Sequence, residues 1–445
     1  MKVTFIMPCV GRKTNQRYVR SWCMEPLAIA TLKALTPDNI DCAFYDDRLE
    51  SIPYNDPTDL IAINIETYTA RRAYQIAAEY KKRAIPVVMG GFHATLMPDE
   101  VEQNADAVVI GEAENLWLQV INDAASGTLK SRYQSENQPM LGGVIPDRSI
   151  YASKKYINLT LIETARGCRF SCEFCSISQF YKSTYRARPI DEIIEEIKLT
   201  GSKRIFFTDD NIAVDKKRTI KFLNALIPLN INWVGQVSID VAKDDNMISL
   251  LKRSGCAGVL IGFESLDTNN LIAMGKNINK IHLNFAEAIN RLRTYGICVY
   301  GTFVFGYDED TEGSFVETLR FAKQTKLFFA AFNHLVPFPG TPLYSRLKNE
   351  GRLRYKSWWL SGNYRFGELA FNPKKLTAQK VSILCFKYRR LFYHPLSIVK
   401  RGIDFKANCK NITMAVLFIH QNIATRLDVE RRQQLPLGIK EVVYK

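Results

Sequence analysis

The sequence contains no long apolar run and no secretory leader. No stretch approaches the roughly 18 consecutive apolar residues of a membrane-spanning helix, and the longest candidate, residues 413–419, is ended by His420 and Gln421. The apolar run within residues 1–9 is too short for a signal peptide and is typical of a first strand. We therefore expect a cytoplasmic protein.

Cysteines are sparse, and their arrangement excludes the disulfide framework of a small secreted domain. The chain has 10 cysteines in 445 residues, and three of them form a C-x3-C-x2-C array at Cys168, Cys172 and Cys175. Each of these thiols can bind one iron of a [4Fe–4S] cube, whose usual fourth cysteine is missing nearby, since the next is Cys256. The fourth iron would then be open to a ligand that is not protein, and Phe174 could pack beside that ligand.

A zinc knuckle is the main alternative for these three cysteines. Structural zinc takes four tetrahedral ligands, and no fourth Cys or His lies within reach of the array in sequence. The array therefore favours an iron–sulfur cluster over zinc.

Acidic residues are fewer than basic residues, above all near the C-terminus. The chain has 60 Lys and Arg against 45 Asp and Glu, a net charge of +15, and residues 371–445 contribute 15 basic against 4 acidic residues, or +11. This excess favours an acidic partner or an anionic membrane surface. A solvated basic helical face explains it equally well.

Short apolar runs alternate with helical patterns over residues 1–145. Such alternation predicts a parallel, doubly wound, Rossmann-like sheet, whose ligands bind beyond the carboxyl ends of the strands. Residues 146–158 are polar and rich in turn formers, and we expect a linker there. The residues predicted at the strand ends are Cys9, Asp46, Glu66, Thr67, Gly90, Gly91, Gly111 and Glu112.

A second series of strands and helices occupies residues 159–345. It contains six strand–helix repeats, whereas eight would close a full α/β barrel, so we expect a partial (β/α)6 barrel that is open on one side. Active sites in such barrels lie at the carboxyl ends of the strands. The polar residues that fall at these ends are Asp209 and Asp210 after the second strand, Gln236 and Ser238 at the third, and Glu264 at the fourth.

The cysteine array with its internal aromatic residue resembles the signature of the radical S-adenosylmethionine (radical SAM) enzymes. The resemblance covers about residues 159–345 and implies that Cys168, Cys172 and Cys175 hold a [4Fe–4S] cluster whose open iron chelates S-adenosylmethionine (SAM). It further implies cleavage of SAM to methionine and a 5′-deoxyadenosyl radical. The SAM contacts implied by the resemblance are Phe174, Asp209, Asp210, Gln236, Ser238 and Glu264.

The N-terminal region is similar to the cobalamin-binding domain that precedes many radical SAM cores, through residues 90–95 and 108–114. The D-x-H-x-x-G motif that supplies a cobalt-ligating histidine is absent, so we expect cobalamin without a protein histidine on cobalt. A domain that keeps the fold without the cofactor, and a His93 that only hydrogen-bonds its loop, stay open. The implied cobalamin contacts are Glu66, Thr67, Gly90, Gly91, His93, Gly111 and Glu112.

Residues 346–445 form a basic, mainly helical region. An aromatic cluster at Trp358, Trp359, Tyr364 and Phe366 could form a lid over the open barrel or simply pack in a core. Helices are expected within residues 377–391, 395–400 and 412–419. Their apolar faces, flanked by Lys and Arg, are compatible with peripheral membrane contact, although packing on the barrel is the simpler alternative.

The resemblance implies a cobalamin-dependent radical SAM enzyme that methylates an unactivated carbon of a small molecule, with a hydrophobic one favoured. It implies an electron donor such as flavodoxin or ferredoxin and no nucleic-acid partner. Radical cyclisation or rearrangement without methyl transfer stays open. Two further alternatives are a methylthiotransferase with a second cluster on Cys9, Cys23 and Cys42, and a non-catalytic iron–sulfur protein that binds nucleic acid through its basic tail.

Overall fold

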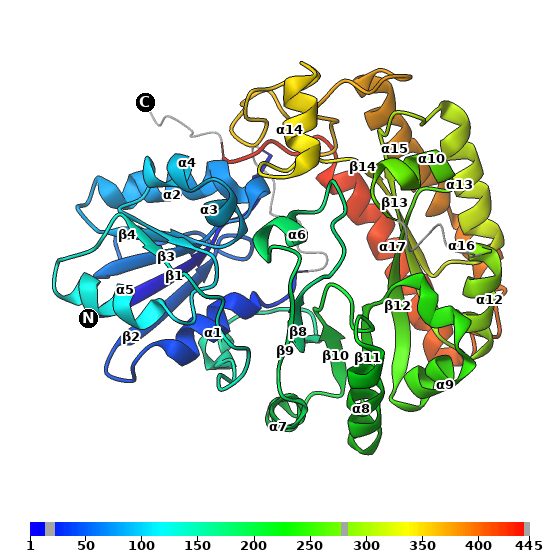
Figure 1. Cartoon of the computed structure of the whole chain (residues 1–445), viewed down its shortest axis with the longest axis horizontal. Coiled ribbons are helices and arrows are strands. Elements are labelled where there is room, and N and C mark those ends of the chain that lie inside the picture. The colour runs from blue at the N-terminus through cyan, green and yellow to red at the C-terminus, as the bar shows by residue number, and fades with distance from the viewer. Residues whose placement is uncertain (14–22, 277–283, 440–445) are drawn as a thin grey trace. The chain divides into compact units, whose positions relative to one another are not determined.

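A computed structural model describes residues 1–13, 23–276 and 284–439 (Figure 1). The chain divides into two compact units. The first unit comprises Met1–Ile157, Tyr355–Phe366 and Gln434–Lys445, and the second comprises Asn158–Arg354 and Gly367–Gln433. Among the described residues, no helix combines the length and the apolar character needed to cross a bilayer.

The first unit contains a six-stranded sheet in the order β2-β1-β3-β4-β5-β6, with every neighbouring pair parallel. Because the chain moves from β1 outward to β2 and then returns to β3, the switch point lies between β1 and β3. This topology confirms the predicted doubly wound sheet. The strands are β1 (Lys2–Met7), β2 (Asp41–Asp46), β3 (Leu60–Asn64), β4 (Val87–Gly90), β5 (Ala107–Ile110) and β6 (Arg132–Gln134).

Helices cover both faces of this sheet, so its central strands are apolar without alternation. In β1, Val3, Phe5 and Ile6 are fully buried. Helices α1 and α5 share one core with the strands, and α2, α3 and α4 lie on the other side of the sheet (Figure 1). The helices are α1 (Leu27–Leu35), α2 (Ala70–Lys81), α3 (Phe92–Leu96), α4 (Pro98–Glu102) and α5 (Trp117–Ala125).

The second unit contains a parallel sheet whose strand order follows the sequence, β7-β10-β11-β12-β13-β14. Within the described ranges, β7 and β14 each pair on one side only, so the barrel is partial and open between them, as the six repeats predict. A short antiparallel hairpin of β8 (Ala165–Gly167) and β9 (Tyr185–Ala187) follows β7. The barrel strands are β7 (Thr160–Ile162), β10 (Arg204–Phe207), β11 (Asn232–Gln236), β12 (Cys256–Glu264), β13 (Cys298–Phe305) and β14 (Phe329–His334).

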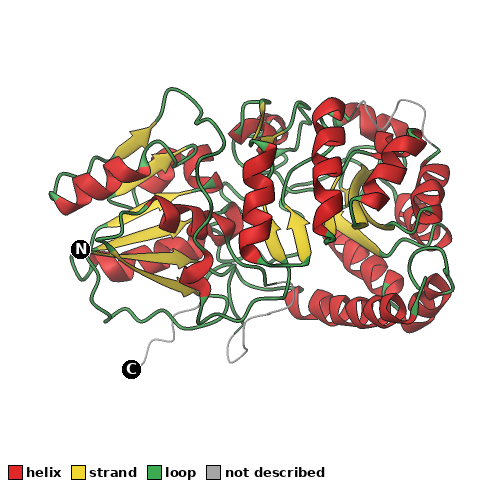
Figure 2. Ribbon diagram, turned by 90° about the horizontal axis from the view of Figure 1, so that it is seen from below, coloured by secondary structure: helices red, strands yellow, loops and turns green. Residues whose placement is uncertain are grey.

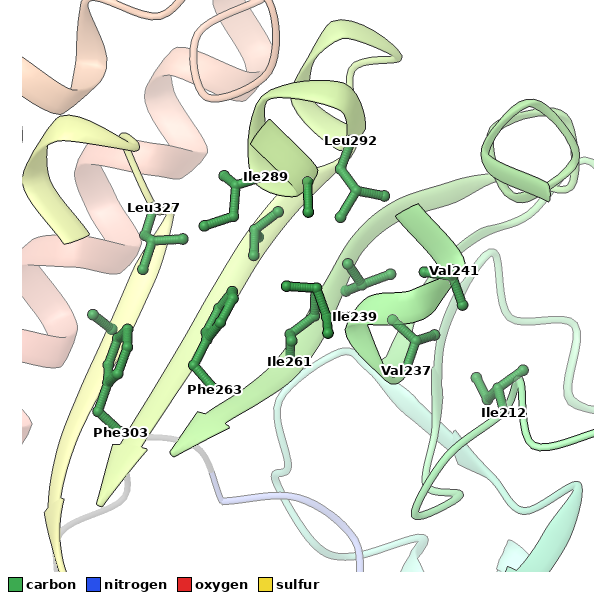
Figure 3. Packing of buried hydrophobic residues seen from close by; sticks show 14 of the residues in the cluster. Ile212, Val237, Ile239, Val241, Ile261, Phe263, Ile289, Leu292, Phe303 and Leu327 are labelled. Carbon is green, nitrogen blue, oxygen red and sulfur yellow. The ribbon is translucent and has the colours of Figure 1, made fainter. Parts of the chain in front are cut away.

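The two faces of the barrel sheet differ in burial. Ile261 and Phe263 of β12 lie against Ile289 and Leu292 of the covering helix α12, and all four are essentially inaccessible (Figure 3). The alternate residues of β12 and β13 point to the other face and are only half-buried. The inner face of the barrel is therefore not filled by the chain's own side chains.

Helices follow the strands around the outside of the second unit (Figure 2). They bury a continuous core with the outward side chains of the strands. The helices of this unit are α6 (Ser176–Phe180), α7 (Ile190–Thr200), α8 (Lys216–Leu226), α9 (Asp245–Arg253), α10 (Thr268–Ala273), α12 (Phe285–Thr294), α13 (Glu312–Gln324), α14 (Pro342–Asn349), α15 (Ala378–Phe392), α16 (Pro395–Gly402) and α17 (Ile412–Arg432).

The helical C-terminal region is present as α15, α16 and α17, but the aromatic cluster before it does not form a lid. Trp358, Trp359 and Tyr364 are fully buried and belong to the first unit. There Trp358 packs against Tyr68, and Trp359 lies edge-on to His93. Packing, the simpler of the two alternatives, therefore accounts for these rings.

Several short elements were not predicted, among them α3, α4, α6 and β6. A helix of five residues or a strand of three is too short to express an apolar period, so pattern analysis passes over it. In the opposite direction, the helix expected over residues 412–419 continues to Arg432.

Candidate active site

The three cysteines lie in the loop that joins β8 to β9 of the second unit. Cys172 is buried, Cys168 and Cys175 are half-buried, and none of them is in a disulfide. Burial raises the pKa of Cys172 to about 11 and also raises the pKa values of the other two thiols. Since only thiolates bind iron, ligation would release protons here.

This donor set fits a cluster better than a single ion. In the part of the chain that the structure describes, no three His, Cys, Asp or Glu side chains converge on a single-ion position. The thiolates of a cube each bind a different iron, so they need not converge in that way. Three free thiols in one loop therefore fit a [4Fe–4S] cluster with one open iron.

Glu173, inside the cysteine array, anchors this loop through all of its polar groups. Its carboxylate accepts two hydrogen bonds from Arg346 of α14, from Nε at 2.6 Å and Nη2 at 3.1 Å, and one from the Tyr307 hydroxyl at 3.2 Å. Its backbone N–H donates to Met274 and its carbonyl accepts from Leu343. The sequence interpretation missed this anchor, because nothing in the local pattern links Glu173 to residues more than 100 positions away.

The structure separates the two aspartates that follow β10. Asp209 is buried and accepts hydrogen bonds from the backbone of Thr164 at 2.7 Å and Ala165 at 3.2 Å, and from the Thr164 hydroxyl. Asp209 therefore joins β10 to the start of the cysteine hairpin and has no free face for a ligand. Asp210 is half-buried and lies close enough to Cys168 and Cys175 to affect their charge.

Burial, followed by the charge of Asp209, raises the pKa of Asp210 to about 6. An ammonium group next to Asp210 would favour its ionised form. Of the two aspartates predicted to contact SAM, Asp210 is thus the one that faces the thiols.

Glu264 ends β12 in a left-handed conformation, with φ of 64°, at an irregularity in its pairing with β13. Its carboxylate folds back to Lys276, with 2.7 Å between Oε1 and Nζ. A Cβ on Gly262 would lie 2.2 Å from that carboxylate oxygen and 2.8 Å from Nζ, so a larger residue there would displace the ends of both side chains.

Lys276 is a second residue that the sequence interpretation missed. Although burial opposes its charge, the Glu264 carboxylate raises the pKa of Lys276, so the side chain stays cationic. Its charge also acts on Cys172 and Cys175. A lysine in an irregular loop carries no sequence signal, and only the fold brings it to the cysteines.

The remaining predicted SAM contacts lie around the same ends of the strands. Ser238 is bonded to Asn211, whose Nδ2 donates to the Ser238 hydroxyl at 2.5 Å. Gln236 is half-buried at the last position of β11, and Phe174 packs its partly buried ring against the barrel core.

In the first unit, glycines shape the carboxyl edge of the sheet. Gly91 has φ of 106°, and a Cβ there would lie 2.3 Å from Asn64 Oδ1, so its glycine is required by the chain's own packing. Gly111 has φ of 83°, and a Cβ there would meet nothing within 4 Å. Thr95 ties the two loops, because it donates to the Gly91 carbonyl and accepts from the Gly111 N–H.

His93 does not lie on this edge. It is fully buried, with Nε2 3.0 Å from Glu100 and Nδ1 3.3 Å from Thr67. Glu100 also accepts hydrogen bonds from the Tyr74 hydroxyl at 2.8 Å and from Trp359 Nε1 at 2.9 Å. The contact predicted between His93 and cobalamin is therefore not available in this structure, and Thr67 is likewise buried and engaged. His93 therefore forms hydrogen bonds that hold its loop, which is the alternative role considered for this residue in the sequence analysis.

Exposed chain remains at this edge for a large ligand. Glu66 is exposed, and Gly90, Gly91, Gly111 and Glu112 are half-buried. The glycines and the exposed backbone leave room at this edge for a broad, flat group such as a corrin ring. The edge therefore fits the predicted cobalamin site. Cys42 is in register with Val3 near the amino end of β1, whereas Cys9 follows the carboxyl end of that strand, so the N-terminal cysteines do not share one edge of the sheet for a second cluster.

Comparison with known proteins gives the same two domains. Residues 22–121 match the B12 binding domain, and residues 162–322 match the radical SAM superfamily. The bacteriochlorophyllide d C-12(1)-methyltransferase of Chlorobaculum tepidum is 32% identical over 389 residues, which cover 84% of each chain. The bacteriochlorophyllide d C-8(2)-methyltransferase of the same organism is 31% identical over 75% of this chain and 78% of its own.

Among solved structures, the radical SAM methyltransferase TsrM from Kitasatospora setae, with cobalamin and a [4Fe–4S] cluster bound, resembles this chain. The TM-score is 0.62 at 15% identity, and the match covers 88% of this chain and 81% of that one. At this identity the likeness establishes a shared fold.

Proposed function

Because this chain belongs to the radical SAM superfamily, in the group whose members carry a B12-binding domain, we propose that it methylates an alkyl side-chain carbon of a cyclic tetrapyrrole. The enzyme is a cobalamin-dependent radical SAM methyltransferase, and its cofactors are a [4Fe–4S] cluster, SAM and cobalamin. When bound, the cluster with SAM supplies a 5′-deoxyadenosyl radical, and cobalamin supplies the methyl group.

One observation carries the choice of substrate. The two relatives at 31–32% identity both have a bacteriochlorophyllide as their named substrate, and the similarity to the first of them spans 84% of both chains. It therefore includes both units.

The inner face of the barrel supports a substrate of this class. Leu260 of β12, together with Tyr300 and Val304 of β13, points away from the covering helices and is half-buried. These side chains offer an apolar and partly aromatic wall, and the barrel is open between β7 and β14. A flat, largely apolar ring suits such a wall, because it removes apolar surface from water without needing many polar partners.

The charged side chains near the cysteines suggest how SAM is oriented. We assign Asp210 to the ammonium group and Lys276 to the carboxylate of SAM, because these two opposite charges both act on the cysteine thiols. Once a SAM carboxylate engages Lys276, Glu264 would be free to accept hydrogen bonds from the ribose hydroxyls. In the first unit, Glu66, Gly90, Gly111 and Glu112 would line the cobalamin.

The reaction also requires electrons. One SAM is converted to S-adenosylhomocysteine and a second to methionine and 5′-deoxyadenosine, with two electrons consumed for each methyl group transferred. A one-electron donor such as flavodoxin or ferredoxin in a reducing cytoplasm would provide them.

The test is an anaerobic assay of the reconstituted protein with cobalamin, reductant and SAM carrying a deuterated methyl group. A bacteriochlorophyllide and a hopanoid are offered separately, and the C172A variant serves as the control. Mass spectrometry should find the labelled methyl on the tetrapyrrole, together with S-adenosylhomocysteine and 5′-deoxyadenosine. A labelled hopanoid with an unlabelled tetrapyrrole would reject the substrate, and 5′-deoxyadenosine with an unlabelled but altered tetrapyrrole would indicate ring formation or rearrangement instead.

A further inference from the structure

Exposed apolar side chains gather in one part of the second unit. Of the 19 large hydrophobic side chains that are exposed in the described residues, 10 lie between positions 396 and 427. Isolated exposed hydrophobic residues are normal on a protein surface, whereas a cluster of them marks an interaction site. The 10 residues are Leu396, Val399, Ile403, Phe405, Ile412, Val416, Leu417, Ile419, Ile423 and Leu427.

Five of these residues form a stripe along the outer side of α17. Ile412, Val416, Ile419, Ile423 and Leu427 follow one another at steps of four, three, four and four residues, the spacing of a single helical face. We call this set the α17 stripe. Their exposed fractions range from 45% to 84%. The stripe therefore faces solvent along nearly the whole helix.

The opposite side of α17 is already used for packing. Phe418 and Asn422 are fully buried, and Phe418 shares a small core with Cys298 and Phe328 at the amino ends of β13 and β14. The helix is thus apolar on two sides, and the core accounts for only one of them.

The solvent side of this helix lacks the charges that exposed helices usually carry. Residues 411–425 contain no Asp, Glu, Lys or Arg. A helix that only faces water gains solubility from such residues, so their absence along four turns points to an apolar environment.

The segment before α17 is rigidly held, so its exposed apolar residues do not belong to a loose end. Arg401 is buried and donates to the carbonyls of Leu327 and Phe328 and to Asn422 Oδ1. Asp404 is bound to Arg293 at 2.7 Å. These bonds fix the loop that presents Ile403 and Phe405, which are 57% and 78% exposed.

Positive charge predominates around the stripe. Glu430, which is exposed one turn beyond Leu427 on α17, is paired with Arg390. The two acidic residues within 395–429, Asp404 and Asp428, are buried and paired with arginines. The exposed charged side chains in that range are Lys400 and Lys406, with Lys410 and Arg426 half-exposed. Apolar side chains flanked by cations are complementary to an anionic lipid surface, where the former enter the acyl boundary and the latter meet the headgroups.

We propose that the α17 stripe docks the enzyme peripherally on anionic lipid bilayers. The chain lies on the membrane through this face, and its binding adds apolar burial to electrostatic attraction. Docking does not depend on which molecule accepts the methyl group.

The experiment measures flotation of the full-length protein with vesicles of phosphatidylcholine, with or without phosphatidylglycerol. The wild type should float with the anionic vesicles, and more weakly at high salt. The triple variant V416Q/I419Q/I423Q should bind at least about tenfold more weakly. A matched variant, L118Q/I220Q/V316Q, changes three exposed apolar residues outside this face and should bind like the wild type.

Folding and catalysis are checked separately. The thermal unfolding and the 5′-deoxyadenosine formation of both variants should equal those of the wild type, so that a failure of the proposed methyl transfer would not affect the result. Absence of wild-type flotation, or equal flotation of the two variants, would overturn the proposal. A wild-type dimer that becomes a monomer only in the stripe variant, with no flotation, would overturn it in favour of an interface between copies.

Discussion

In the first unit Asp46 and Asp47, at the carboxyl end of β2, are buried and paired with arginines, whereas in the second unit Asp210 and Lys276 stay half-buried near the thiols. Asp46, at the end of β2, is fully buried between Arg48 at 2.6 Å and Tyr156 at 2.8 Å. Asp210, at the end of β10, keeps a free face beside the cysteines. The first edge therefore leaves its glycines and Glu66 accessible, and the second leaves Asp210 and Lys276 partly accessible beside the thiols.

This difference follows from what each edge has to recognise. A corrin ring is broad and nearly flat, so a site for it needs space and close backbone approach, which glycine provides. SAM carries an ammonium and a carboxylate group, so a site for it needs side chains of opposite charge, the role that we propose for Asp210 and Lys276. Substitutions in the first unit should therefore change cofactor binding by altering the shape of the site. Substitutions in the second unit should change it by altering charge or thiol ligation.

Loss of one cysteine should have the largest effect and should be confined to the second unit. In C172A the cluster loses one of three thiolates, so 5′-deoxyadenosine should fall below detection while cobalamin binding, followed by its visible absorption, stays at the wild-type level. Equal loss of cobalamin would show that the two sites are not separable. The matched control is C256S, which alters a buried thiol outside the array.

Release of the Glu173 anchor should have the next largest effect. R346Q removes both hydrogen bonds from the guanidinium to the cysteine loop, and retained iron or the rate of 5′-deoxyadenosine formation should fall about 10- to 100-fold. R352Q is the control, because Arg352 pairs with Asp308 and Glu350 and not with the loop. Equal losses of iron or activity in R346Q and R352Q would show that the hydrogen bonds between Glu173 and Arg346 do not support the cluster.

The two glycines of the first unit should respond differently to alanine. Both have positive φ, which costs about 1–2 kcal/mol for alanine, but only Gly91 also faces an overlap with Asn64. G91A should therefore lower the free energy of unfolding by about 3 kcal/mol or more, and G111A by about 1 kcal/mol with a loss of cobalamin affinity. Chemical denaturation measures the free energy of unfolding of both variants, and titration measures their affinity for cobalamin. Equal losses of stability in G91A and G111A would contradict the cost assigned to the overlap with Asn64.

Replacement of His93 should have the smallest functional effect. H93N breaks the bonds to Glu100 and Thr67, so stability should fall by about 1–3 kcal/mol. The absorption spectrum of bound cobalamin should not change, because the imidazole has no exposed face. A changed spectrum in H93N would reinstate His93 as a cobalamin contact, and exposed His420, changed to Asn, provides the control for stability.

Pattern analysis reached the architecture of both sheets, with β6 of the first sheet as the exception. The six barrel repeats and the doubly wound first sheet follow from apolar runs that alternate with helical periods. It could not separate Asp209 from Asp210, since both follow the same strand and only their hydrogen bonds differ. It also could not find Lys276 or Arg346, which meet the cysteine loop from distant loops and helices.

The sequence by itself determined the cysteine array, the two α/β domains and the absence of a long apolar segment, because each is written in local spacing and composition. The tertiary structure decided which polar residues remain available to a ligand. It placed His93 and Trp359 around Glu100 in a buried network, brought Lys276 to the thiols, and left the α17 stripe uncovered. The reason is physical: a side chain's availability depends on its burial and on hydrogen bonds to residues far away in the chain, which no local pattern encodes.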